Sequence, residues 1–268
     1  MTETFTLPPG AATGVGVRIL GPVEVYAGGA VHRPRGPKVR KLLALLAVRA
    51  RDIVDVGTLV EELWDGAAPA SAVSTVRTHV YHLRQELAQE LRLPGMHSVI
   101  TTEGTGYSLR PAPGLLDVEE FTRLYGLGRT ALHARKYDVA LDRLDAALAL
   151  WRGRTLADVT RGRVLDGHAT RIEELRSRAD ELRIEAAMQL GRHRELVPEL
   201  HRLIAVDPLN EWLHARLIDA LHRCGRRGEA LRAFHQVRSV LAEELGLEPN
   251  EDLLRLQRHI LSGAAAAS

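Results

Sequence analysis

An amphipathic helical segment followed at once by a short hairpin constrains the fold more than any other feature of this sequence. At about 100° per residue, five apolar residues of segment 71–87 fall within one arc of roughly 80°, which predicts a helix with one face in a core. This stripe consists of Val73, Val76, Val80, Leu83 and Leu87. Segments 99–102 and 107–109 are strand-like, and Gly104-Thr105-Gly106 between them is typical of a tight turn.

The opposite face of the same helix is rich in uncharged hydrogen-bonding side chains. The centre of that face carries Ser74, Thr78, Tyr81, His82 and Gln85, with Arg77 and Arg84 on one flank and Thr75 and His79 on the other. An ordinary solvated helix would fit the same spacing, but it would more usually carry Glu and Lys there. The pattern suits base edges at the centre and phosphates at the margins.

The residues before this helix predict short strands and two further helices. Strands are expected at 17–20, 23–25 and near Val31, and a helix from Pro37 to about residue 50. A second helix is expected at 56–65, with Thr58 and Glu61 at capping-box spacing, and Ser71 is a plausible N-cap for the third. Together with the hairpin, these elements outline a winged helix-turn-helix over residues 17–110, after a disordered leader at 1–16.

This outline assigns a DNA contact to each polar side chain of the helix and wing. We expect Ser74, Thr78, Tyr81 and His82 to meet base edges in a major groove, with Thr75 beside them. Phosphate contacts are expected from Arg77, His79, Arg84 and Thr102 or Thr105.

Charge adds a second, weaker indication. Residues 33–51 hold seven basic residues and no acidic one, although the net charge of the chain is only +2. Such a cluster attracts polyanions, and it equally fits a solvated helix face.

The second half of the chain is predicted to be entirely helical. Pro111-Ala112-Pro113-Gly114 marks a linker at 111–116, and helical spacing of apolar residues recurs in seven segments: 117–134, 136–151, about 165–190, 193–206, 209–224, 226–244 and 249–261. Gly191 and Gly225 stand 34 residues apart in similar contexts, the period of tetratricopeptide repeats, and the segment at Tyr137 looks like a degenerate copy. A plain helical bundle is the alternative. The fold class is thus mainly α with a small β component, and 263–268 reads as a disordered tail.

Residues 17–110 resemble the winged-helix domain of bacterial response regulators. The resemblance is carried by the segment 78–84 in the recognition helix and by Gly104-Thr105-Gly106-Tyr107 in the wing. Glu103 departs from it, because that family often has a basic residue at the wing tip, and Tyr81-His82 replace residues that are commonly basic. The leader is also shorter than a receiver domain, so phosphorelay control within this chain is not expected.

Residues 117–262 resemble the bacterial transcriptional activation domain, through Asp207-Pro208-Leu209-Asn210-Glu211-Trp212, Gly225-Arg226-Arg227-Gly228-Glu229 and Glu244-Leu245-Gly246-Leu247-Glu248-Pro249. A winged helix followed by this domain is similar to the Streptomyces antibiotic regulatory protein family. The resemblance implies an activator of a secondary-metabolite gene cluster in an actinobacterium. It also implies a protein that binds direct repeats as a head-to-tail homodimer and contacts RNA polymerase with its principal sigma factor. We therefore expect a cytoplasmic, nucleoid-associated protein.

Other classes fit the sequence poorly. None of the twelve histidines has a metal-ligand spacing, and the single cysteine, Cys224, excludes an intrachain disulfide or a cysteine-based metal site, so no cofactor, metal or catalytic residue is predicted. No apolar stretch is long enough to span a membrane. A helical-repeat interaction scaffold that does not bind DNA is the remaining alternative, which the basic stretch and the polar helix face disfavour.

Overall fold

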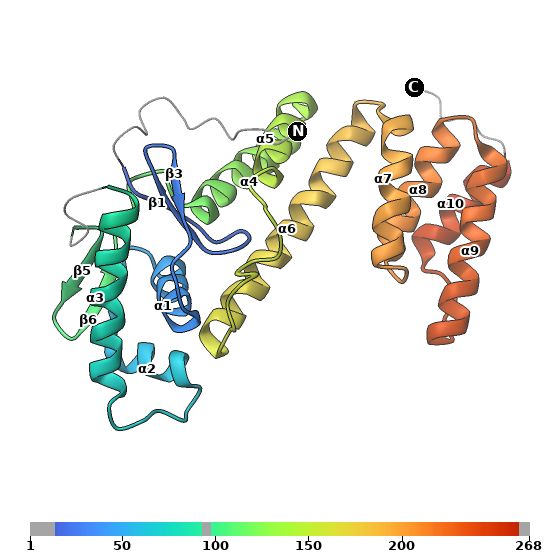
Figure 1. The fold of residues 1–268 in the computed structure, drawn as a ribbon. Coiled ribbons are helices and arrows are strands. Elements are labelled where there is room, and N and C mark those ends of the chain that lie inside the picture. Colours follow the sequence, from blue (N-terminus) through green and yellow to red (C-terminus); the bar gives the residue numbers. More distant parts are fainter. Residues whose placement is uncertain (1–13, 93–97, 263–268) are drawn as a thin grey trace. The chain divides into compact units, whose positions relative to one another are not determined.

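The computed structural model describes residues 14–92 and 98–262 and confirms a mainly α-helical chain with two small sheets (Figure 1). The strands are β1 (Gly16–Arg18), β2 (Glu24–Ala27), β3 (Ala30–His32), β4 (Val54–Asp55), β5 (Ile100–Glu103) and β6 (Gly106–Leu109). The first helices are α1 (Pro37–Val48), α2 (Val56–Trp64), α3 (Ala72–Glu90), α4 (Asp117–His133) and α5 (Tyr137–Leu148). The remaining helices are α6 (Arg163–Gln189), α7 (His193–Val206), α8 (Glu211–Arg223), α9 (Arg227–Leu245) and α10 (Glu251–Ser262).

The ends of the chain were predicted to be disordered. Residues 1–13 and 263–268 lie outside the described part. The predicted leader at 1–16 is too long, because Val15 is buried and Gly16 begins β1. In the described part, no helix has the length and hydropathy needed to cross a bilayer.

The wing hairpin pairs with a further strand, β4, that was not predicted from the sequence. In the second sheet β6 lies between β4 and β5, and Gly106 pairs with both Asp55 and Glu103. A Cβ atom at Gly106 would lie 2.4 Å from the carbonyl oxygen of Val54, so only glycine allows β4 to approach. Gly104 has a φ of +54°, as the hairpin turn requires. A two-residue strand such as β4 has no period of its own to detect.

Helix starts were predicted less well than helix spans. Pro37 occupies the first turn of α1 as expected. The capping box predicted for α2 is wrong: Asp55 is the N-cap, and its carboxylate accepts a hydrogen bond from the Thr58 N–H at 2.9 Å. Hydrogen bonds from the Thr58 hydroxyl and N–H lower the pKa of Asp55. Ser71 is the N-cap residue of α3, but its side chain makes no capping hydrogen bond.

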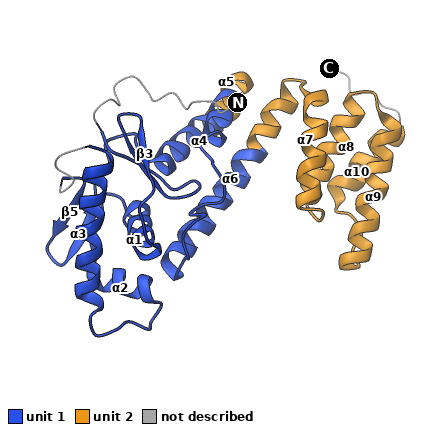
Figure 2. Cartoon of the chain, viewed as in Figure 1, with its two compact units in different colours: residues 1–130, 142–181 blue, residues 131–141, 182–268 orange. Residues whose placement is uncertain are grey.

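The chain forms two compact units whose limits differ from the predicted domain boundary (Figure 2). Unit 1 comprises residues 1–130 and 142–181, and unit 2 comprises 131–141 and 182–268. The segment predicted as a linker, 111–116, is packed against β1: the Val17 N–H donates to the Leu115 carbonyl at 2.9 Å, and Leu115 and Leu116 are buried. The winged helix therefore continues directly into the packing of α4 and the start of α6.

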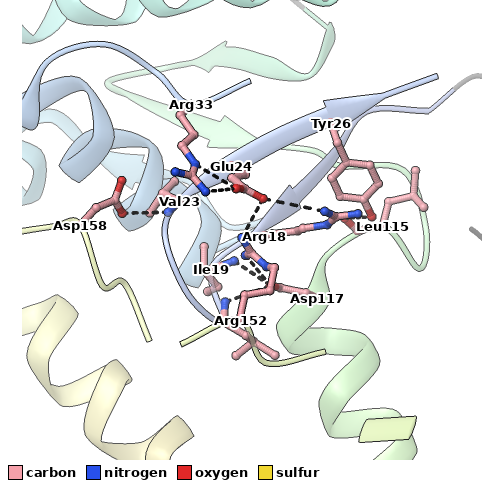
Figure 3. Close-up of polar contacts among 11 residues, drawn as sticks. Arg18, Ile19, Val23, Glu24, Tyr26, Arg33, Leu115, Asp117, Arg152 and Asp158 are labelled. Carbon is pink, nitrogen blue, oxygen red and sulfur yellow. Dashed lines mark hydrogen bonds and ion pairs between the residues drawn. The ribbon is translucent and has the colours of Figure 1, made fainter. Parts of the chain in front are cut away.

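Buried ion pairs and backbone contacts hold this continuation together (Figure 3). The carboxylate of Asp117, at the start of α4, accepts hydrogen bonds at 2.9 Å from the backbone N–H groups of Ile19 and Leu20. Glu24 is 6% exposed and pairs with Arg33 at 2.8 Å and with Arg152 at 2.7 Å. Burial raises the pKa of Asp117, which the two N–H groups and the nearby Arg152 oppose. The contacts with Asp117 and Arg152 join the β1–β2 hairpin to residues 97 to 128 positions further along the chain.

Glu62 provides the other junction in unit 1. Its carboxylate is 3% exposed and accepts hydrogen bonds from the N–H groups of Gly162 at 2.8 Å, Val164 at 2.9 Å and Leu165 at 3.3 Å. These N–H groups belong to the residue before α6 and to its first turn, where N–H groups have no partner within the helix. A side chain of α2 thus caps a helix that begins 100 residues later.

Unit 2 contains the predicted repeats. Gly191 and Gly225 end α6 and α8 in the left-handed region, with φ of +74° and +76°. In both turns the next N–H donates to a carbonyl five residues back, from Arg192 to Ala187 at 3.0 Å and from Arg226 to Leu221 at 2.9 Å. The same turn recurs between α4 and α5, where Arg135 takes the glycine position with a φ of +58°. The degenerate copy near Tyr137 is therefore a real structural repeat of this turn.

We predict that Glu62→Ala destabilises the chain, because it leaves three N–H groups of α6 without an acceptor in a buried place. An unpaired buried donor costs about 1–3 kcal/mol, so the loss should be at least about 2 kcal/mol in urea unfolding followed by circular dichroism. Glu61→Ala is the matched control, since among the described residues its exposed side chain pairs only with Arg163, at 3.5 Å, and such pairs contribute about 0–1 kcal/mol. Equal losses in the two variants would contradict a capping role for Glu62.

Candidate nucleic-acid interface

Helix α3 presents the two faces that its sequence predicts. Val76, Val80, Leu83 and Leu87 are at most 1% exposed, whereas Tyr81 is 57% exposed and Ser74, Arg77, Thr78 and His82 are also exposed. Val73 was wrongly assigned to the buried stripe and is 45% exposed. It lies at the edge of the arc in the first turn, where Ala72 packs inward instead. The polar face of α3 is therefore free of the core along its length.

The hydroxyl groups on this face are held in fixed orientations by the helix itself. Ser74 and Thr75 donate to the Ser71 carbonyl at 2.8 and 2.9 Å, and Thr78 donates to the Ser74 carbonyl at 3.0 Å. Each hydroxyl hydrogen is thus used within the helix, and the oxygen lone pairs are left as acceptors. This half of the face presents acceptors, not donors.

Tyr81 and His82 supply the complementary donors one turn further along. Their rings pack edge to face with centroids 5.5 Å apart, and both side chains are exposed. His79, on the flank, is half-buried; burial and the neighbouring charges of Lys38 and His82 lower its pKa, which favours the neutral imidazole. A neutral His79 can donate one hydrogen bond but adds no positive charge.

The two flanking arginines have different surroundings. Arg77 is exposed and makes no hydrogen bond or ion pair with any residue that the structure describes. Arg84 is half-buried and donates from Nε to the Ile100 carbonyl at 2.9 Å and from Nη2 to the Thr102 hydroxyl at 3.0 Å. Its guanidinium also lies 5.9 Å from the centre of the Tyr107 ring. Arg84 and Thr102, both expected at phosphates, are thus engaged with each other and connect α3 to the wing.

The wing tip carries one exposed polar side chain without a partner among the described residues, that of Thr105. Glu103, next to it, accepts hydrogen bonds from Thr101 at 2.7 Å and from Arg110 at 2.8 Å, and these bonds lower its pKa. The negative charge of Glu103, the residue that departs from the response-regulator pattern, is therefore balanced by its ion pair with Arg110.

Most of the basic stretch at 33–51 is occupied inside unit 1. Arg33 pairs with Glu24, Arg40 with Asp158 at 3.4 Å, and Arg51 with Glu119, while Lys41 is only 8% exposed. Lys38 lies over the Trp64 ring at 4.0 Å and contributes to the potential at His79. Two of the seven basic residues are therefore associated with α3: Lys38, through the potential at His79, and Arg35, which pairs with Glu90 at 3.2 Å.

The two halves of the chain match two protein families. Residues 34–109 match "Transcriptional regulatory protein, C terminal", and residues 116–261 match "Bacterial transcriptional activator domain". The regulatory protein DnrI of Streptomyces peucetius is 38% identical over 91% of each chain. The regulator RedD of Streptomyces coelicolor is 33% identical over 92% of this chain and 71% of its own length.

The chain belongs to the Streptomyces antibiotic regulatory protein family.

Comparison with a solved structure supports the same fold for this chain. EmbR of Mycobacterium tuberculosis, in complex with a low-affinity phosphopeptide, is similar with a TM-score of 0.85 and 28% identity over 94% of this chain and 66% of that one. The family relationship confirms a winged helix-turn-helix followed by a helical activation domain, and the protein is a transcription regulator. In the described residues, no group of three or more His, Cys, Asp or Glu side chains is placed to hold a metal ion.

The contacts around the site that the sequence did not predict all depend on distant partners. Lys38 lies forty positions before the centre of α3, and the acceptor of Arg84 is a backbone carbonyl, which no side-chain pattern marks. The only sequence signal for the second contact is the position of an arginine on the flank of the polar face.

We predict that the main effect of Arg84→Ala is a looser wing, because the hairpin loses the guanidinium that joins Ile100 and Thr102 to α3. A loss of about 1 kcal/mol should speed amide exchange in residues 100–109 on the order of fivefold in hydrogen–deuterium exchange. Arg77→Ala, on the same helix without these contacts, should leave the hairpin unchanged. Unaltered exchange in Arg84→Ala would show that the wing does not depend on this residue.

Proposed function

We propose that this chain is a sequence-specific DNA-binding transcriptional activator whose helix α3 reads a major groove. The observation that supports the proposal most directly is the exposed, uncharged hydrogen-bonding face of α3, backed by a fully buried apolar stripe and followed by the hairpin. A rigid helix with such a face meets the requirement for direct readout, in which side chains form fixed hydrogen bonds to base edges.

The orientation of the hydroxyl groups suggests which base edges they read. Ser74 and Thr78 already donate within the helix, so they accept from the amino group of cytosine or adenine. Tyr81 and His82 carry donors and suit the acceptors of guanine, adenine N7 or thymine O4. Thr75 lies beside this set at the margin.

The same geometry divides the proposed backbone contacts into two classes. Arg77 and Thr105 contact phosphates directly, and neutral His79 adds one hydrogen bond. Arg84 and Thr102 contribute mainly by positioning the wing, because their polar groups are engaged with each other. The number of ion pairs with phosphate is therefore smaller than the count of basic residues in the sequence implies.

Activation is assigned to the helical repeats. We propose that the protein binds direct repeats upstream of promoters as a head-to-tail homodimer and recruits RNA polymerase with its principal sigma factor. Its target is a secondary-metabolite gene cluster, and its location is the cytoplasm, at the nucleoid. Membership in a family whose relatives are named as regulatory proteins supports this assignment and a role without catalysis. The alternative, a repeat scaffold that does not bind DNA, does not explain the exposed polar face of α3.

Substitutions on the polar face test base reading. Footprinting on the promoters beside the gene first defines the cognate site, and Thr78→Ala and His82→Ala should then each lower affinity for it by about 1–3 kcal/mol, with little effect on random duplex. The matched control is Thr122→Ala, because Thr122 is also exposed on a helix and donates to the carbonyl four residues back. Equal losses on cognate and random DNA would show that these side chains do not read bases.

Arg77→Ala tests the phosphate contact. Each phosphate neutralised contributes about 0.9 to the slope of log affinity against log salt concentration, so the variant should lower that slope by about one unit on both cognate and random duplex. Fluorescence anisotropy titrations at several salt concentrations measure the slope. Arg194→Ala, an exposed arginine on α7, serves as the control. An unchanged slope in Arg77→Ala would place its side chain away from the phosphates.

A further inference from the structure

Unit 1 contains a strongly basic depression that the proposed DNA contacts do not use. It has a volume of about 380 Å³ and lies between the end of α1 and the first turns of α6. Its lining consists of Arg49, Arg163, Val164, Gly167, His168 and Arg171. No residue of α3 or of the wing contributes to it.

The charges around the depression are all of one sign. Three of its lining residues are arginines and none is acidic. Arg49 and Arg171 are exposed and make no ion pair with any described residue, and Arg163 has only a 3.5 Å contact with Glu61, in which both side chains are largely exposed. Four other arginines of unit 1, Arg33, Arg40, Arg51 and Arg152, do have carboxylate partners.

The guanidinium groups border the same space. Residues 164, 167, 168 and 171 share one face of α6 because they are three, four and seven positions apart, and Arg49 approaches that face from α1. His168 lies between them, and burial together with the charges of Arg49 and Arg171 lowers its pKa. The space that these groups border is therefore one of positive potential, which an anion would neutralise.

Gly167 keeps the depression open. It lies inside α6, where glycine is the least favourable residue after proline, yet a Cβ atom there would meet no atom within 4 Å. Neither packing nor a left-handed backbone requires glycine at this position. The absence of a side chain leaves room beside the three guanidinium groups.

We propose that this depression binds a small molecule that carries phosphate. Guanidinium groups match phosphate oxygens in pairs, and three of them around one space fit a group with more than one negative charge. Val164 and Gly167 supply an uncharged surface against which an organic part of the ligand can lie. The site is separate from the DNA-reading face, so this inference does not depend on the proposed function.

Calorimetric titration of the full chain tests the site with two probes, ADP and inorganic pyrophosphate, at low chloride concentration. The wild-type protein should bind at least one of them, and Arg49→Gln combined with Arg171→Gln should weaken binding at least tenfold. Arg178→Gln, an exposed arginine on the same helix outside the depression, should bind like the wild type. Tighter binding of ADP than of pyrophosphate would identify a nucleotide-like ligand, and equal binding would identify the inorganic group.

A steric variant tests the site without changing charge. Gly167→Leu fills the depression, and because leucine favours helix, its thermal midpoint should equal or exceed that of the wild type by about 2–4 °C. Binding of both probes should be lost in this folded variant. Failure of the wild type to bind either probe at millimolar concentration, or unchanged binding in Gly167→Leu, would overturn the proposal. So would reduced duplex affinity in the arginine variant without binding of either probe, which would make the depression a DNA contact.

Discussion

Two buried carboxylates that accept hydrogen bonds from backbone N–H groups hold the first unit together. Asp117 binds the N–H groups that follow β1, and Glu62 binds those of the first turn of α6. A carboxylate can be buried only where several donors replace its water, and an N–H group at a helix start can be buried only where an acceptor reaches it. The carboxylate thus supplies the acceptor that the N–H groups need, and the N–H groups supply the donors that the buried carboxylate needs. If the two separated, both would lose their hydrogen-bond partners. The winged helix and the first helices of the activation domain therefore fold as one compact unit.

Within that unit, the position of the wing depends on α3. The guanidinium of Arg84 extends from the helix to a strand carbonyl and a wing hydroxyl, so a displacement of the helix displaces the hairpin. The hydroxyls of Ser74 and Thr78 are oriented by the helix carbonyls and do not need to reorganise in the proposed complex with DNA. Binding sites whose groups are fixed beforehand lose less conformational entropy on association. The arrangement favours discrimination between base sequences over adaptation to many of them.

The sequence predicted those parts of the structure that have a period or a turn signature. The faces of α3, the hairpin with Gly104 and Gly106, and the repeated turns at Gly191 and Gly225 each depend on neighbours within a few residues. The errors have the opposite character. Segment 111–116 has the composition of a linker, but the carbonyl of Leu115 accepts a hydrogen bond from Val17 of β1, 98 positions earlier in the chain. Glu62 resembles the exposed Glu61 beside it in sequence, and only the start of α6, 100 residues later, distinguishes the two. Arg84 could be recognised as polar but not as a structural residue, because its acceptor is a carbonyl.

The two ends of α1 each place a basic residue near one of the two proposed anion sites. Lys38 lies in the first turn, near His79 and the polar face of α3, and Arg49 follows the last turn, at the depression on α6. At 1.5 Å per residue the two positions are about 16 Å apart along the axis, roughly twice the screening length of about 8 Å at physiological ionic strength. Through solvent, an anion at Arg49 is therefore largely screened from the ammonium of Lys38. The carboxylate of Glu62 joins the start of α6, which borders the depression, to α2, which packs against α3. The hydrogen bonds that hold the unit together are thus also the available route between its two proposed sites.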